Sequence, residues 1–259
     1  PYDDIAKGNI FKSASSLSKP DSGVFYFQNR YAAGLLSDED SVVFIAGVTS
    51  DRLERSFGES TLVVKGAESF ILDGMSASGK IVFISDSLIV VTGSTLLSDV
   101  ILISRDIIIQ DGFEGNLQAF ATRSVIIGEN CMLKLPSLIV ASQNGIAWYS
   151  PQDSLKVEIG TGSIVCGNVI LSTAGLPCYF LSGKFSRVIG QVYCPGSVEL
   201  GGSVEGSLYC DGFYLKTTRS WYLNHLLNNR VEFDGLPTTY AGVDIFGTIE
   251  RKTLIKWLL

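Results

Sequence analysis

Charged residues that could perform acid–base chemistry gather in one part of the chain, where two aspartates lie close to two arginines. The four residues are Arg105, Asp106, Asp111 and Arg123. Two carboxyl groups beside arginines are typical of sites that bind or cleave polysaccharides, because one carboxyl group can donate a proton while the other acts on the sugar. A surface ion pair between Asp86 and Arg105 would explain the same residue types, and such pairs are common in proteins.

The sequence gives little support for catalysis or metal binding by histidine or cysteine. His225 is the only histidine, and no serine–acid combination lies near it. The five cysteines form no CxxC pair; they are Cys131, Cys166, Cys178, Cys194 and Cys210. The sequence therefore predicts no zinc site, and we expect free thiols that pack as small apolar residues. The similar strings QVYC and SLYC place Cys194 and Cys210 in equivalent positions of successive structural units.

The glycines of VEIGTGSIVCG (157–167) have some features of a dinucleotide-binding loop. Such a loop needs a helix directly after the glycines, because the helix N-terminus holds the phosphates. Here the following residues favour β-strand, so no nucleotide site is predicted. A net charge of −6 without a basic stripe also argues against nucleic acid as a partner. We predict no cofactor and no metal.

The elements that position these residues come from a repeat in the middle of the chain. FILDG (70–74), IVVTG (89–93) and IIQDG (108–112) follow one another at intervals of nineteen residues. A second series alternates with them at the same period, including IVFIS (81–85) and VILIS (100–104). Each candidate strand is short, rich in β-branched residues and bounded by turn residues. The pattern predicts an all-β protein, a single-stranded parallel β-solenoid with about 18–20 residues per coil.

Equivalent positions in successive coils should form columns of side chains. Because side chains along a strand alternate between its two faces, one apolar column points inward and its neighbour points outward. The sequence leaves open which is which, and also whether flanking segments or another subunit cover the outer face. We predict a contact with a partner protein through one column and the C-terminal tail, namely Phe83, Leu102, Phe120, Val140, Trp257 and Leu258.

The chain divides into three regions by composition. Residues 1–58 form an N-terminal capping or packing segment, in which 23–36 and 41–48 have the pattern of strands. Residues 59–216 form the solenoid, and 217–259 form a C-terminal helical cap with an apolar tail. TTRSWYLNHLLNNR (217–230) predicts the helix of this cap, with Thr218 or Ser220 as its N-cap. Such a helix would cover the open edge of the last coil.

The glycine–valine pattern IGQVYCPGSVELGGSVEGSLYCDGFYLKT (189–217) resembles the bactofilins, the bacterial cytoskeletal proteins that form polymers. The resemblance implies a β-helix of short coils that polymerises end to end. It also implies a scaffold without an active site in the bacterial cell envelope. The chain differs from that family in its large flanking segments and in its central coils, which are richer in Ile, Leu and Phe.

Together these patterns predict a non-enzymatic structural or assembly protein that contacts protein, either itself or an envelope component. The alternative is a carbohydrate-binding or polysaccharide-cleaving β-helix protein that uses the acids and arginines named above.

The chain begins at Pro1, so we expect a preceding segment such as a signal peptide or membrane anchor. The longest uncharged apolar run, 87–98, is too short and polar to span a membrane. An extracytoplasmic location is favoured, with the cytoplasmic face as the alternative.

Overall fold

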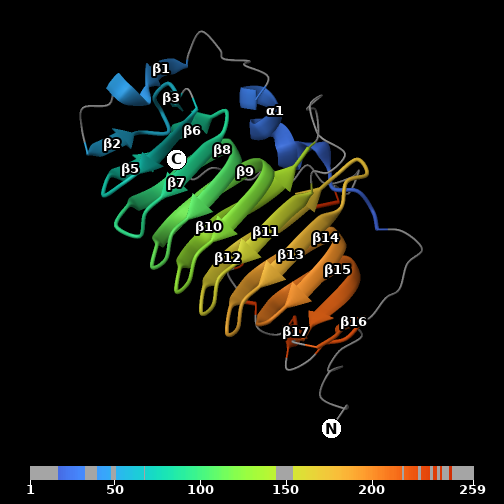
Figure 1. Ribbon diagram of the computed structural model, residues 1–259. Helices are drawn as coiled ribbons and strands as arrows, with labels where there is room; N and C mark the ends of the chain where they lie inside the picture. The colour runs from blue at the N-terminus through green and yellow to red at the C-terminus, as the bar shows by residue number, and fades with distance from the viewer. Residues whose placement is uncertain are drawn as a thin grey trace.

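The computed structural model is a β-solenoid of about 8 turns, in which parallel coils stack along one axis (Figure 1). The repeat therefore predicted the fold correctly. The structure describes residues 17–32, 40–47, 51–66, 68–143, 154–217, 219–226, 229–233, 236–237, 240 and 245–246.

Each coil contributes strands to three faces of the rod, and the long strands bend from one face into the next. The first face contains β1 (Ser41–Phe44), β3 (Leu62–Gly66) and β6 (Ile81–Ser85). It continues through parts of β8 (Leu96–Ile109), β9 (Glu114–Ile127), β10 (Met132–Ser142), β12 (Ile164–Ser172), β14 (Arg187–Leu200) and β15 (Ser203–Lys216).

The other two faces use the same long strands together with shorter ones. The second face adds β4 (Ser69–Leu72), β7 (Leu88–Val91), β11 (Leu155–Ile159) and β13 (Cys178–Ser182). The third face adds β2 (Arg52–Arg55), β5 (Ser76–Gly79) and β17 (Arg230–Glu232). All these pairings are parallel, because each strand pairs with the strand one coil further along and the chain runs in the same direction along a face in every coil.

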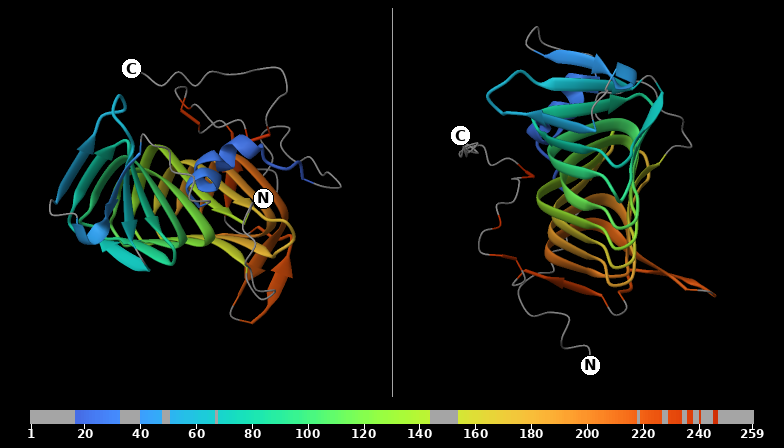
Figure 2. Two further views of the ribbon diagram at one scale, coloured as in Figure 1. Left: turned by 90° about the horizontal axis from the view of Figure 1, so that it is seen from above. Right: turned by 90° about the vertical axis from the view of Figure 1, so that its left-hand side faces the viewer.

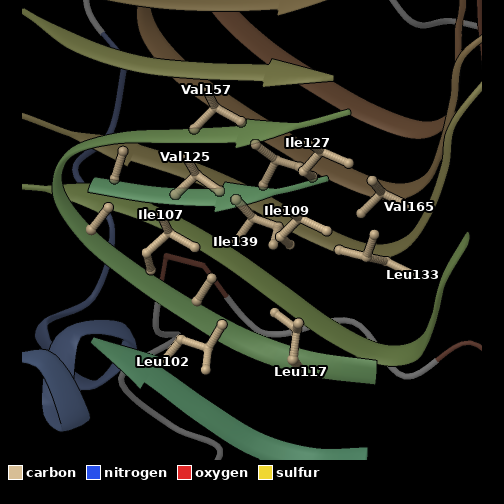
Figure 3. Packing of buried hydrophobic residues seen from close by; sticks show 14 of the residues in the cluster. Leu102, Ile107, Ile109, Leu117, Val125, Ile127, Leu133, Ile139, Val157 and Val165 are labelled. Carbon is tan, nitrogen blue, oxygen red and sulfur yellow. The ribbon is translucent and has the colours of Figure 1, made fainter. Parts of the chain in front are cut away.

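The interior of the rod is filled by apolar side chains that converge from the three faces (Figure 3). The inward column of the first face has no exposed surface; it comprises Val64, Phe83, Leu102, Ala119 and Ile139. Burying a large aliphatic or aromatic side chain contributes about 1.5–3 kcal/mol relative to leaving it exposed. A single coil could bury few such side chains by itself. Most of the stabilisation therefore comes from the stacking of one coil on the next.

The register between β8 and β9 differs from the alignment expected from the sequence. Phe120 pairs with Ile103 and not with Leu102, because the ladder has irregularities on both sides of this segment. The step from Ile84 to Ile103 is nineteen residues, whereas the step from Ile103 to Phe120 is only seventeen. The expected column Phe83–Leu102–Phe120–Val140 is consequently wrong. Its first two members face the interior and its last two face outward.

The outward side of the first face is covered by the chain's own flanking segments (Figure 2). The 3₁₀ helix η1 (Ser22–Phe25) and helix α1 (Tyr26–Ala32) pack on it together with Ile245 and Phe246. The two flanks also bond to one another, since Asp21 N donates to Ile245 O at 2.6 Å. Of the two covers that the sequence left open, the structure has the intramolecular one.

Residues 23–32 are helical, so the strand expected over 23–36 is wrong for the described part of that range. The Asp21 side chain accepts from Gly23 N at the start of η1 and stabilises the turn. The buried side chains Val24, Gln28 and Tyr31 recur every three or four residues, which is helical spacing. Residues 41–44 do form strand β1, followed by the 3₁₀ helix η2 (Ile45–Gly47). Since β1 and β2 already pair with later coils, the solenoid begins before residue 59.

The helix expected over 217–230 is also wrong, because none of the described residues in that range is helical. Instead β16 (Trp221–Leu223) folds back antiparallel on β15, with Trp221 paired to Lys216. The Thr217 hydroxyl accepts from the backbone N–H groups of Arg219 and Ser220 and fixes the turn. The edge of β15 supplies hydrogen bonds to β16 that helix propensity alone could not anticipate.

The glycine-rich stretch near the C-terminal end forms β14 and β15, which pair in parallel as the last long strands of the rod. Gly190 has φ 152°, and a Cβ atom there would lie 1.9 Å from Gly167 O in the coil beneath. Only glycine fits such an approach. Cys194 and Cys210 are paired neighbours in this ladder, which confirms their equivalent positions.

Candidate functional sites

Of the four charged residues considered for polysaccharide chemistry, the structure joins only two. Arg123 Nε donates to Asp106 Oδ1 at 2.8 Å and its Nη2 to Oδ2, so the pair is bidentate across adjacent coils. Ser124 Oγ also donates to Asp106, whose side chain is only 11% exposed. These bonds occupy the carboxylate oxygens of Asp106 and fix the guanidinium group.

Asp111 lies at the following corner of the coil, where its carboxylate accepts from Glu129 N at 2.7 Å. It lies five positions after Asp106 and beyond the end of β8 at Ile109, so the backbone span between the two aspartates is at most about 16 Å. Three of the four residues between them are in the extended strand, which keeps the two carboxylates apart. Arg105 is exposed in β8, where this strand bends from the first face into the second. The geometry therefore does not place two carboxyl groups around one sugar linkage.

A second ion pair has the same form as the first. Arg187 donates to both carboxylate oxygens of Glu205 at 2.8 and 2.9 Å, again between neighbouring coils. Arginine and carboxylate are exposed to 43% and 13% in this pair, and to 44% and 11% in the Arg123–Asp106 pair. The same bidentate form at two different places on the rod indicates a structural role for both pairs, each of which ties one coil to the next.

The residues predicted to contact a partner occupy several environments. Phe83 and Leu102 are fully buried inside the rod, while Phe120 and Val140 are fully buried beneath the flanking cover. None of these four is accessible to a partner of the folded chain. Trp257 and Leu258 lie outside the described residues.

All five cysteines are free. The sulfur atoms of Cys178 and Cys194 are 4.0 Å apart inside the rod, and their hydrogen bond lowers the pKa of Cys178 and raises that of Cys194. Burial raises the pKa of Cys210, next in the same ladder, to about 11. The raised pKa values keep the thiols of Cys194 and Cys210 protonated at neutral pH, and Cys178, whose pKa is lowered, is buried beside Cys194 in the apolar core.

A cavity that no sequence motif predicted lies between α1 and the N-terminal coils. Its volume is about 780 Å³, and its lining combines aromatic, charged and amide side chains. The residues that matter here are Phe27, Arg30, Tyr31, Asp40, Phe57, Lys80, Asp99 and Gln118. One signal in the sequence is Gln118, which stands in an outward column between Ile101 and Leu138.

The wall of this cavity formed by α1 is held by buried polar contacts. Arg30 pairs with Asp40 at 3.2 Å, and the Asp40 side chain is 2% exposed. The guanidinium group also lies 5.3 Å from the centre of the Tyr31 ring. Burial raises the pKa of Tyr31, against a smaller opposing effect of its hydrogen bond with Thr61, so the phenol stays protonated at neutral pH.

Exposed apolar side chains gather on the hairpin at the C-terminal end of the rod. Trp221, Tyr222 and Leu223 of β16 are exposed to 64%, 43% and 60%. In the right-hand view of Figure 2 the orange and red end of the rod carries this hairpin, which projects from the last coil. Just after β16, the His225 imidazole is held against the backbone of that strand by a hydrogen bond between its Nδ1 and Leu223 O, at 2.7 Å.

Comparison of the chain with protein-family models, curated proteins and solved structures found no match. Across the described parts of the chain, no helix is both long and apolar enough to cross a membrane. Within the same residues, no group of three or more His, Cys, Asp or Glu side chains has an arrangement that could hold a metal ion.

Proposed function

We propose that the chain is a non-enzymatic structural or assembly protein, and that it acts by pairing with a second copy of itself through β16. The observation that carries this proposal is the exposed Trp221–Leu223 strand, the apolar outer strand of a projecting hairpin. Single exposed apolar residues are ordinary, but three in succession on the outer strand of a sheet are typical of a contact surface.

A second copy is the occupant that this edge fits by symmetry. When two identical strands pair antiparallel, a two-fold axis relates them and the contact closes on itself. Tyr222 of one copy would lie opposite Tyr222 of the other, and Trp221 opposite Leu223. The result is a four-stranded antiparallel sheet in which β15 and β16 of each copy take part. No charged side chain of β16 opposes this pairing.

Stacking of rods end to end, as the resemblance to bactofilins implies, meets an electrostatic obstacle. The outermost strands of the third face are β2 at one end and β17 at the other, with the similar sequences Arg52-Leu53-Glu54 and Arg230-Val231-Glu232. A continuous ladder would place arginine beside arginine and glutamate beside glutamate. Like charges directly opposite one another destabilise a sheet, so we place the contact on the hairpin and not on the rod ends.

Light scattering and sedimentation of the whole chain over a range of concentrations would test the proposal. We expect a monomer–dimer equilibrium that Trp221→Lys shifts strongly to monomer, because a lysine on an edge opposes strand pairing. Phe185→Lys is the matched control, since Phe185 is 82% exposed on a turn away from β16, and this variant should dimerise like the unmodified chain. A chain that stays monomeric at every concentration, or equal effects of both lysines, would contradict the proposal.

A further inference from the structure

The cavity beside α1 has properties that a scaffold does not require. Its volume of about 780 Å³ lies within the range of about 300–1,000 Å³ that is typical of small-molecule sites. It also lies where a flanking segment meets the solenoid, with walls drawn from α1, the turn after β2, and strands β8 and β9. Junctions of this kind are a preferred place for ligand sites.

Aromatic rings form part of the cavity wall. Phe27 and Tyr31 come from α1, with the Phe27 ring 6.4 Å from the ring of Phe120 beneath it. Phe57 comes from the turn after β2 and is 53% exposed although it lines the cavity. A large ring that lines a cavity and remains half exposed has apolar surface that a ligand in the cavity can contact.

The polar lining suits hydroxyl groups better than charged ones. Gln118 presents an amide, which both donates and accepts, at a position where neighbouring coils have Ile101 and Leu138. The Gln118 side chain is only partly buried, and its paired neighbours in the column are aliphatic. The packing of the column therefore does not require an amide at this position. The charged lining residues balance, since Arg30 and Lys80 are matched by Asp40 and Asp99.

We propose that this cavity binds a neutral sugar of about disaccharide size. A sugar ring has an apolar C–H face that packs on an aromatic ring, and a rim of hydroxyls that both donate and accept hydrogen bonds. The rings of Phe27 and Phe57 meet the first need, while Gln118 and the partly exposed guanidinium group of Arg30 meet the second. The balance of charges gives an anion such as phosphate no net attraction. This inference is independent of the dimer contact on β16.

Saturation-transfer NMR on the whole chain tests the proposal with three probes: cellobiose, maltose and N,N′-diacetylchitobiose. Two variants remove ligand contacts while leaving the core of the rod in place. Phe57→Ala removes a half-exposed ring, and Gln118→Leu keeps the side-chain volume while continuing the aliphatic column. Phe185→Ala makes the same aromatic deletion on a different exposed turn and serves as the control. Circular dichroism of each variant establishes that its solenoid is intact.

We expect at least one disaccharide to bind, with affinity reduced about tenfold in Phe57→Ala, the loss of one aromatic contact. Gln118→Leu should weaken binding about fivefold, the loss of one hydrogen bond, and Phe185→Ala should leave it unchanged. Absence of binding by all three sugars would overturn the proposal. So would binding that both cavity variants leave unaltered, or competition by inorganic phosphate at concentrations near those of the sugar.

Discussion

Phe185 is the residue whose backbone conformation is hardest to reconcile with its side chain. Its φ is 60°, in the left-handed region that bulky residues avoid. Equivalent turns of other coils have Gly112, Asn130 and Gly162 at this position, each with positive φ. The Phe185 ring is 82% exposed, so little burial within the chain offsets the strain.

We therefore expect Phe185→Gly to stabilise the chain by about 1 kcal/mol, because glycine adopts this conformation without steric cost. Urea denaturation monitored by circular dichroism would measure the change in the free energy of unfolding. The reciprocal change, Gly162→Phe, should destabilise by a similar or larger amount. A loss of stability in Phe185→Gly would show that the exposed ring makes a contact that outweighs the strain.

At the scale of elements, the decisive feature is the short step between β8 and β9. In this register Leu102 points into the rod, while Ile101 and Ile103 point outward under the flanking cover. The sequence cannot show which of the three side chains point inward, because all three are apolar and there is no alternation of polar and apolar residues. A shift of one residue exchanges the two faces of a strand, so only the pairing itself decides the orientation.

This orientation predicts different costs for neighbouring truncations. Leu102→Ala should destabilise the chain by about 2–5 kcal/mol, because it leaves a cavity in a fully buried column. Ile101→Ala should cost about 1 kcal/mol, because Ile101 is only partly buried on the outer face. Thermal and chemical denaturation of both variants would measure these values. Equal costs, or the reverse order, would refute the register.

At the scale of the whole molecule, two phenols tie the flanking segments to the solenoid. Tyr193 of β14 donates to Ser18 O at 3.0 Å, and Tyr240 of the C-terminal flank donates to Asn168 Oδ1. Burial raises the pKa of each phenol from its ordinary value of 10.0 to about 12. The flanks are therefore held by groups that must stay protonated.

The raised pKa values predict a loss of stability at alkaline pH. Below pH 10 both phenols are protonated in the folded and unfolded chain, so their contribution is complete. Between pH 10 and about 12 the unfolded chain ionises first, and the free energy of unfolding falls. Denaturation across this range would measure the decline. Tyr240→Phe should reduce its steepness while lowering stability by about 1 kcal/mol at neutral pH; an unchanged slope would contradict the assignment.

The sequence alone determined the parallel solenoid. Strands such as IVVTG and IIQDG recur at a period too short for a crossover helix, and stacked coils are the arrangement that satisfies their backbone hydrogen bonds. It also determined the stacking of Cys194 on Cys210, because both lie in one local motif of constant length. These features depend on spacing along the chain, which a sequence contains directly.

Other features were decided only by tertiary structure. Residues 221–223 became a strand because the edge of β15 offered hydrogen bonds, although the apolar spacing around them suits a helix. Arg30 and Gln118 share a cavity because α1 packs on the first face of the rod, although the two residues lie far apart in the sequence. Asp106 became the partner of Arg123 because the coils stack in this register, which left Asp111 at the next corner. Each outcome rests on contacts between distant segments, whose energies no local pattern contains.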